Sequence, residues 1–481
     1  MAALELVVYA VLLAAAAAAV WRRPVWALYV FVVGLALHNA AMAALYAAGV
    51  RGSTLTAIAA WKEILLVVAL ARVSRDAWEQ RALPFRWMLV DWLALAYGAL
   101  VVVYALIPQS ALDGVAGKHA IALALKHDIV PVGAYFLGRS LHLGRADLRR
   151  LAWTLLGTAG FVAALGIVDV YEVPIGWWRT NGVVDYFHKQ LGYDYHGTGE
   201  NPKVAGLPEN FIYNTGSEQH FLRRLVSTFL SPLAAGYLMV VALLLLPVRR
   251  AAVLLGALAF AGLLFTFSRS SLLALAGGLV VLALASRDWR PFALAVVVVG
   301  VTVGWAHEFP KIGPTGTWTK ADLVYQASHA KTVSGPTSGS AVSENEPSLH
   351  EHWTSLKDGI HTVVHHPQGY GLGNVGQTAS RTGTPIKAGE SNYTEMGAEL
   401  GILGALLWTA WGLALLVGLW RAGSVRMAAA FAAILALAIQ TDVIGDPWVA
   451  YVVWALAGAL LVRTRPEERL AAAPDRAIAL P

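Results

Sequence analysis

The chain has no cysteine at all. Disulfide bonds, thiolate nucleophiles, Cys-bound zinc and Cys-held iron–sulfur clusters are therefore excluded, while the redox compartment stays open. Charged residues are scarce too: they make up 14% of the 481 residues, against about 25% in an ordinary soluble domain. So few charges exclude a water-soluble globule. Any chemistry must use carboxylates, imidazoles, cations or hydroxyls.

Apolar residues, in contrast, make up 57% of the chain. A helix needs about 20 of them to cross the hydrocarbon, where every backbone N–H and C=O must be paired within the segment. The 18 Trp and 16 Tyr also suit membrane interfaces. The sequence predicts an all-α fold, a polytopic transmembrane helical bundle of about 12 to 13 helices. The predicted spans are 2–20, 25–49, 54–72, 87–107, 119–142, 151–172, 226–247, 251–267, 271–285, 292–306, 393–420, 427–445 and 447–463.

Basic residues fall in every second link between these spans. Since Lys and Arg are retained on the cytoplasmic side in short loops, the two long polar segments lie outside. An odd number of spans places the N-terminus outside, and Trp21-Arg22-Arg23 indicates a reverse anchor rather than a signal peptide. The predicted regions are N-terminal transmembrane helices (1–172), a first large outer loop (173–225), central transmembrane helices (226–306), a large outer loop with an amphipathic helix (307–392), C-terminal transmembrane helices (393–465) and a cytoplasmic tail (466–481).

The second outer loop contains a predicted helix that begins at Pro347 and ends before Pro367. Ser348 and Glu351 form a capping-box start, and apolar residues follow at helical spacing along one face. The glycine run 369–376 comes next, where backbone can approach a partner closely. This run is not a dinucleotide fingerprint, because no parallel strand precedes it and no crossover unit surrounds it.

Two metal-site alternatives are weaker than their ordinary interpretations. His361 and His365 are four residues apart on this helix, a spacing that can grip zinc. A third strong ligand is missing, so a polar helix face is favoured. The rival cluster lies in the first outer loop at unspecific spacing and consists of Asp185, His188, Asp194 and His196.

Charges at the edge of the hydrocarbon mark candidate sites. Arg224 precedes a central span, and Arg269 sits in a short outer turn. Arginine is disfavoured in outer loops, because basic residues are retained on the cytoplasmic side. A guanidinium can also bind a diphosphate through two parallel hydrogen bonds. Anion binding is therefore favoured over snorkelling of these side chains to phospholipid phosphates. Charges within two earlier spans are either self-neutralising pairs or cavity lining: Lys62, Glu63, Lys126, His127 and Asp128. Acidic residues at outer ends are expected to be solvated: Asp169, Glu172, Asp442 and Asp446.

Three stretches in this order resemble the O-antigen ligase and polymerase family of integral membrane glycosyltransferases. The first runs from Arg224 to Pro232, and the second is Ser268-Arg269. The third extends from Trp353 through the glycine run to Glu390-Ser391-Asn392-Tyr393 and ends in Glu399-Leu400-Gly401-Ile402-Leu403-Gly404. The similarity covers roughly 220–420 and implies a GT-C-like bundle. The family's ligases usually carry histidine where this chain has Glu390, and since the family also contains polymerases, ligase and polymerase both stay open.

The resemblance implies glycosyl transfer from a polyprenyl-diphosphate-linked glycan to an acceptor hydroxyl at the outer leaflet, inverting and without a metal or other cofactor. As a carboxylate, Glu390 would take the acceptor proton, with His361 or His365 as weaker candidates. Arg224 and Arg269 would stabilise the departing diphosphate. The predicted substrate-binding residues are Arg223, His361, His365, Tyr393 and Lys126.

The implied partners are the lipid-linked donor, undecaprenyl diphosphate being the typical carrier, a glycan or lipid-glycan acceptor, and membrane lipids, with no nucleic acid. The implied location is the bacterial inner membrane, in cell-envelope polysaccharide biosynthesis, with the active site facing the periplasm. A transporter or flippase of lipid-linked glycans is the alternative, since it would also need many helices and cavity charges. A structural scaffold is a third class, which predicts that charge changes at Arg224 and Arg269 are tolerated.

Overall fold

The computed structural model describes residues 2–193, 207, 211–213, 219–247, 249–320, 323–324, 347–385, 387 and 391–461. Helices dominate the described chain. The first half contains α1 (Ala2–Arg22), α2 (Trp26–Ala47), α3 (Gly52–Ala59), α4 (Trp61–Gln80), α5 (Leu89–Leu106), η1 (Gln109–Leu112), α6 (Lys118–Ser140), α7 (Arg145–Glu172), α8 (Ile175–Thr180), α9 (Val183–Asp185) and η2 (Tyr186–Gln190). The second half contains η3 (Ser227–Phe229), α10 (Pro232–Leu244), α11 (Arg250–Phe265), α12 (Arg269–Ser286), α13 (Arg290–Ile312), α15 (Pro347–His365), α16 (Gly376–Thr382), α17 (Asn392–Arg421), α18 (Val425–Leu437), η4 (Val449–Val453) and α19 (Trp454–Leu460).

The membrane-spanning bundle agrees with the sequence. Among the described residues, eight helices are long and apolar enough to cross a membrane, and five shorter apolar helices accompany them. Every predicted span falls on one of these helices. The all-α polytopic bundle is therefore confirmed.

Close packing joins the N-terminal and C-terminal helices of the bundle. A Cβ atom on Gly138 of α6 would collide with the carbonyl of Ala455 in α19, so the two backbones touch where small residues meet. Beside this crossing, the ring centroids of Trp411 and Trp454 lie 4.3 Å apart, and Tyr135 meets Trp411 edge-on at 5.6 Å. These rings form the centre of the core, where α6, α17 and α19 meet.

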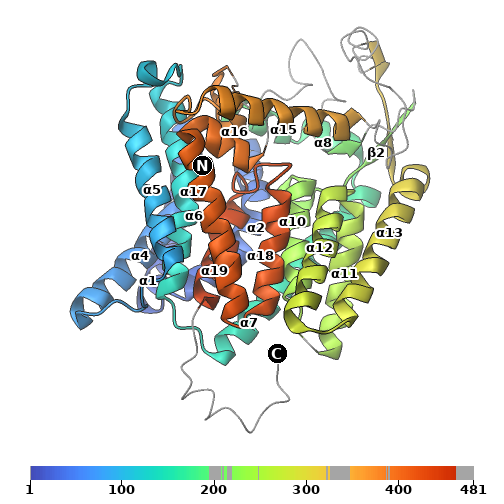
Figure 1. Ribbon diagram of the computed structural model, residues 1–481. Coiled ribbons are helices and arrows are strands. Elements are labelled where there is room, and N and C mark those ends of the chain that lie inside the picture. Colours follow the sequence, from blue (N-terminus) through green and yellow to red (C-terminus); the bar gives the residue numbers. More distant parts are fainter. Residues whose placement is uncertain are drawn as a thin grey trace.

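The two ends of the bundle differ in composition. Figure 1 shows α8, α15, α16 and β2 gathered across one end. A small antiparallel sheet lies there, in the order β1 (Ile212–Tyr213), β2 (His220–Arg223) and β3 (Thr315–Thr317). Basic links meet at the other end: Arg23 pairs with Asp147 at 3.7 Å, and Arg139 Nη2 donates to the carbonyl of Arg86 at 2.9 Å. The end with α15 is thus the one predicted to lie outside.

Two predicted spans are shorter than expected: one begins late and the other ends early. Each difference has a local cause. The span expected from 226 begins at Pro232, because Ser227–Phe229 forms the 3₁₀ turn η3 and Ser231 caps α10 by accepting from Ala234 N at 3.4 Å. The span expected to reach 445 ends at Leu437, because Ala438 O accepts a hydrogen bond from Asn392 N at 3.0 Å instead of continuing the helix. Irregular backbone of this kind is tolerated in a membrane bundle where it lines a cavity.

Candidate functional site

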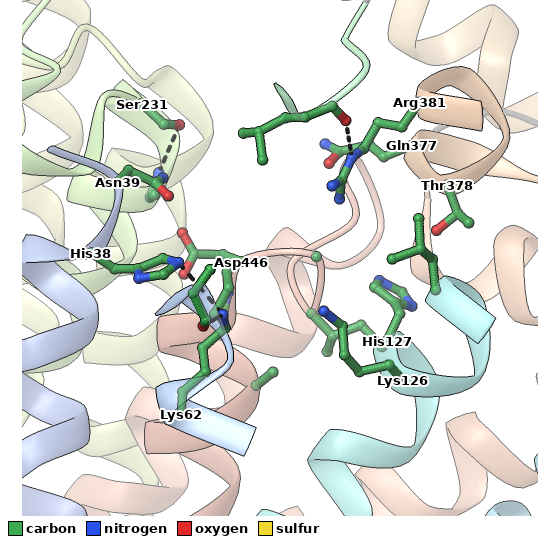
Figure 2. Close-up of a pocket in the computed structure, with 18 of the residues that line it drawn as sticks. His38, Asn39, Lys62, Lys126, His127, Ser231, Gln377, Thr378, Arg381 and Asp446 are labelled. Carbon is green, nitrogen blue, oxygen red and sulfur yellow. Dashed lines mark hydrogen bonds between the residues drawn. The ribbon is translucent and has the colours of Figure 1, made fainter. Parts of the chain in front are cut away.

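A polar cavity of about 510 Å³ opens between the irregular segments. α2, α3, α4, α6, α16 and the connection from 438 to 448 contribute to its wall. Figure 2 shows Lys62 and His38 on one side, Lys126 and His127 on the other, and Arg381 above them. α16, which Figure 1 shows at the same end of the bundle as α15, contributes Gln377, Thr378 and Arg381 to the cavity wall. In a membrane protein, this many charged side chains around one cavity mark the cavity as a candidate functional site.

The lysines of the cavity share one carboxylate. Lys62 Nζ lies 3.6 Å from one oxygen of Glu63, and Lys126 Nζ lies 3.3 Å from the other. Lys62 is buried and donates to the carbonyl of Ala59 at 2.8 Å, at the end of α3. The break between α3 and α4 thus places Lys62 on the cavity wall. The sequence left pairing and cavity lining open, and the structure shows both.

His127 is held between two carboxylates. Its Nδ1 lies 2.7 Å from Asp128 Oδ1, and its Nε2 lies 3.0 Å from Asp442 Oδ2. Asp442 also accepts from Asn392 Nδ2 at 2.7 Å and from Gly445 N at 2.8 Å. Burial opposes ionisation of Asp442, but His127 and these donors outweigh it and hold its pKa below the usual range. Asp442 is buried, and its hydrogen bonds order the 438–448 connection. The expectation that it is solvated is therefore wrong.

Asp446 belongs to the same connection and lines the cavity. Its Oδ1 accepts from Trp448 N at 2.6 Å, just before η4 begins. Burial raises the pKa of Asp446 to about 7, against the opposing effect of this backbone donor. A carboxyl group with such a pKa can change its protonation state near neutral pH. The expectation that Asp446 is simply solvated is wrong as well.

The glycine run forms a turn that is bound to a break in α17. Tyr370 N donates to Ala398 O at 2.7 Å, and Gly371 N donates to Glu399 O at 3.0 Å. These carbonyls are available because α17 is interrupted at Gly401, where φ is +71°. A Cβ atom on Gly401 would collide with the carbonyl of Pro367. The glycine run and the Glu-Leu-Gly stretch therefore form one structural unit.

This unit positions α16 over the cavity. Gly373 N donates to Glu399 Oε1 at 2.8 Å, and α16 begins three residues later at Gly376. α16 carries Arg381, whose Nε donates to Leu191 O at 2.8 Å and whose guanidinium lies 5.2 Å from the ring centroid of Tyr193. The first outer segment and the second thereby meet above the cavity.

Arg224 contacts the turn that precedes α12, and Arg269 is the first residue of that helix. Arg224 Nε donates to Thr266 O at 2.9 Å, and the Arg269 guanidinium lies 5.8 Å from the ring centroid of Tyr213. Burial and the charge of Arg269 lower the pKa of Arg224 to about 10, so Arg224 stays charged at neutral pH. Neither arginine is among the residues that line the polar cavity in the described chain. They form a separate cationic centre.

The other predicted residues are dispersed. Lys126 lines the cavity, whereas Arg223 is buried and binds the carbonyl of Val173 at 2.7 Å. Tyr393 Oη donates to Leu435 O at 3.1 Å. His361 and His365 stack at 3.8 Å between ring centroids on the exposed side of α15. Glu390 lies outside the described residues, as do Asp194 and His196 of the rival metal cluster.

Several cavity residues carry no sequence signal of a site. His38 and Asn39 lie in an ordinary apolar helix, and Gln377 and Arg381 follow the glycine run in a polar segment. Asp446 looked like a helix-end carboxylate. Only the distant contacts made by the glycine turn and the 438–448 connection bring these side chains together.

Part of the chain is similar to a known protein family. Residues 251–409 match the model of the family described as O-antigen ligase. No curated protein matches the chain. The matched segment includes Arg269, the glycine turn and the break at Gly401. The match confirms the resemblance to the O-antigen ligase family, and the helices make the protein a multi-pass membrane protein.

Proposed function

We propose that the protein is a membrane glycosyltransferase of the O-antigen ligase or polymerase type. It takes a glycan from a polyprenyl-diphosphate-linked donor and joins it to an acceptor hydroxyl at the outer leaflet of the bacterial inner membrane. The observation that carries this proposal is the family match over 251–409, since the matched segment includes the glycine turn and α16, which lines a charged cavity in a transmembrane bundle.

The proposed reaction is a single displacement. The acceptor oxygen attacks the anomeric carbon, the bond to the diphosphate oxygen breaks, and the configuration at that carbon inverts. The leaving diphosphate gains negative charge, which Arg224 and Arg269 stabilise as preorganised cations. Two such cations make a divalent metal unnecessary in this mechanism.

A carboxylate takes the proton of the acceptor hydroxyl. The sequence nominates Glu390, and Asp446 is the carboxylate with a pKa near neutral that the described cavity offers for the same step. Lys126 contributes positive charge to the substrate cavity. Arg223, His361, His365 and Tyr393 remain proposed substrate contacts outside the described cavity wall.

The test is transfer by the purified protein in vesicles, with polyprenyl-diphosphate glycan and candidate acceptors, with and without a chelator. New glycosidic bonds that form equally well with chelator support the proposal. A ladder of products indicates a polymerase, and one transfer to a distinct acceptor indicates a ligase. If no bond forms but labelled glycan lipid crosses the bilayer, and still does so in Glu390→Gln, the protein is a transporter or flippase.

A further inference from the structure

A pocket of about 390 Å³ opens between α2 and α7, at the end of the bundle that is predicted to face the cytoplasm. Its wall combines three cations with three aromatic rings: Arg23, Arg149, Arg150, Trp26, Tyr29 and Trp153. In the described chain, none of these residues lines the polar cavity. The pocket is therefore separate from the site proposed above for transfer.

The cations of the pocket outnumber its carboxylates. Arg23 Nη2 lies 3.7 Å from Asp147 Oδ1, so this pair is neutral as a whole. Arg149 and Arg150 belong to the same wall, and Asp147 is its one carboxylate among the residues that the structure describes. Two arginines thus remain without a matching negative charge in the wall. A pocket with this excess of positive charge suits an anionic ligand.

The cations and the aromatic rings lie at different depths. Arg149 precedes Trp153 by four residues, which is about one turn of α7. Arg23 likewise precedes α2, whereas Tyr29 lies in its first turn. Both helices run from this end into the bilayer, so the charges lie at the membrane surface and the rings lie deeper. This order matches a phospholipid, whose phosphate lies at the surface and whose acyl chains extend into the hydrocarbon.

The aromatic part of the pocket is accessible and joins the two helices. Trp26 is 46% exposed, and its ring centroid lies 5.5 Å from that of Tyr29. Tryptophan and tyrosine settle at the level of the lipid headgroups. Tyr29 Oη also donates to the carbonyl of Asp147 at 3.3 Å, which ties α2 to the first turn of α7. A lipid in the pocket would therefore contact both helices and stabilise their junction.

We propose that this pocket binds an anionic phospholipid of the cytoplasmic leaflet. The phosphodiester accepts hydrogen bonds from Arg149 and Arg150, and the acyl chains extend along Trp26 and Trp153. Basic pockets between transmembrane helices on the cytoplasmic side suit such headgroups. A zwitterionic phospholipid is disfavoured, because its own cation would meet the excess positive charge. The lipid holds α2 against α7 whatever reaction takes place in the polar cavity, so the inference is independent of the proposed function.

Thermal unfolding of the full-length protein in a neutral detergent tests the site. Added dioleoylphosphatidylglycerol should raise Tm by at least about 2 °C, because a ligand that binds only the folded state stabilises it. Dioleoylphosphatidylcholine and inorganic phosphate should give no shift at the same concentrations. An equal shift with phosphatidylcholine would mean that any phospholipid suffices, and an equal shift with phosphate would mean a site for a free anion. Either result would overturn the proposal.

A charge-matched pair of variants separates the pocket from general surface charge. Arg149→Gln combined with Arg150→Gln should require at least about tenfold more phosphatidylglycerol for the same shift. The control is Arg249→Gln combined with Arg250→Gln, another exposed adjacent pair in a basic link, which should respond as wild type. Thr154→Trp fills the pocket, keeps every arginine and should abolish the shift. Equal losses in the two double variants, or a normal response in Thr154→Trp, would contradict the proposal.

Cross-linking tests the site in the wild-type protein, so that it does not depend on the folding of any variant. A trace of phosphatidylglycerol with a photoreactive diazirine near its headgroup, in phosphatidylcholine vesicles, should label peptides from the first turns of α2 and α7. Excess unlabelled phosphatidylglycerol should remove this labelling, whereas more phosphatidylcholine should leave it unchanged. Labelling spread evenly over α2, α7 and the lipid-facing helix α13 would show ordinary bilayer contact and would refute a specific site.

Discussion

Arg224 and Arg269 hold two positive charges next to each other at the end of the bundle with α15. Arg224 is half-buried, and the neighbouring charge of Arg269 makes its protonated state harder to maintain. A bound diphosphate would relieve this repulsion and would accept hydrogen bonds from both planar guanidinium groups. The benefit grows as the leaving group gains charge, so the pair should act on the transition state more than on substrate binding.

Replacing either arginine should therefore slow transfer more than it weakens binding. Arg224→Ala and Arg269→Ala should each reduce kcat by about 10²- to 10³-fold, and lysine at the same positions should restore part of it. The measurement is steady-state transfer in vesicles, normalised to folded protein. Arg250→Ala, at the start of α11, is the matched control and should keep wild-type activity. Near-normal transfer in both arginine variants would show that this pair does not stabilise the leaving diphosphate.

Asp446 should make transfer sensitive to pH. Its pKa is raised to about 7, so the charged carboxylate is lost as the pH falls through 7. If this carboxylate takes the acceptor proton, kcat should rise with pH up to about 7 and then level off. Asp446→Asn should remove both the activity and this pH step, while Glu390→Gln should keep them. The reverse result, with Glu390→Gln inactive and Asp446→Asn active, would assign the proton transfer to Glu390.

The break in α17 shows how a short motif builds a site. Gly401 adopts φ +71°, which favours glycine, and its neighbours give their carbonyls to the glycine turn. An alanine there would be strained by about 1 to 3 kcal/mol and would also press against Pro367. Since the turn carries α16, loss of this contact should disturb the cavity wall as well as the fold.

Gly401→Ala should lower the thermal unfolding temperature and reduce transfer. The matched control is Gly423→Ala: Gly423 also has a positive φ, +81°, but no atom lies within 4 Å of its added Cβ. Gly423→Ala should be destabilised only by the strain of its backbone, and it should keep wild-type transfer activity. Melting curves in detergent and transfer assays on both variants measure the difference. Equal effects in the two variants would mean that close packing of the turn contributes nothing.

The helices could be predicted from the sequence because each one satisfies its own backbone within a single apolar run. Their number and order were recovered in this way, and so was the helix from Pro347 to His365. The break after Ala59 and the early end at Leu437 were missed, because a few polar residues inside a long apolar run do not by themselves end a predicted span. The cavity depends on these interruptions. Lys62 and Lys126 could be proposed as lining from their charge alone, but Asp446 and Arg381 required contacts between distant segments.

The distribution of basic residues over the whole molecule predicts its orientation in the membrane. Basic links lie at one end of the bundle, and α8, α15 and α16 lie at the other (Figure 1). Because basic loops are retained in the cytoplasm, the charged cavity should open toward the outside. The proposed donor and acceptor would then meet at the outer leaflet.

The absence of cysteine makes this orientation directly measurable, since any thiol that is introduced is the only one in the chain. Thr354→Cys on α15 and Ser286→Cys at the end of α12 both place it at an exposed position, one at each end of the bundle. In intact spheroplasts, a membrane-impermeant maleimide should label Thr354→Cys and leave Ser286→Cys unlabelled until the membrane is permeabilised. The cysteine-free parent controls for background. The opposite pattern would place the cavity on the cytoplasmic side, where a transferase acting at the outer leaflet could not work.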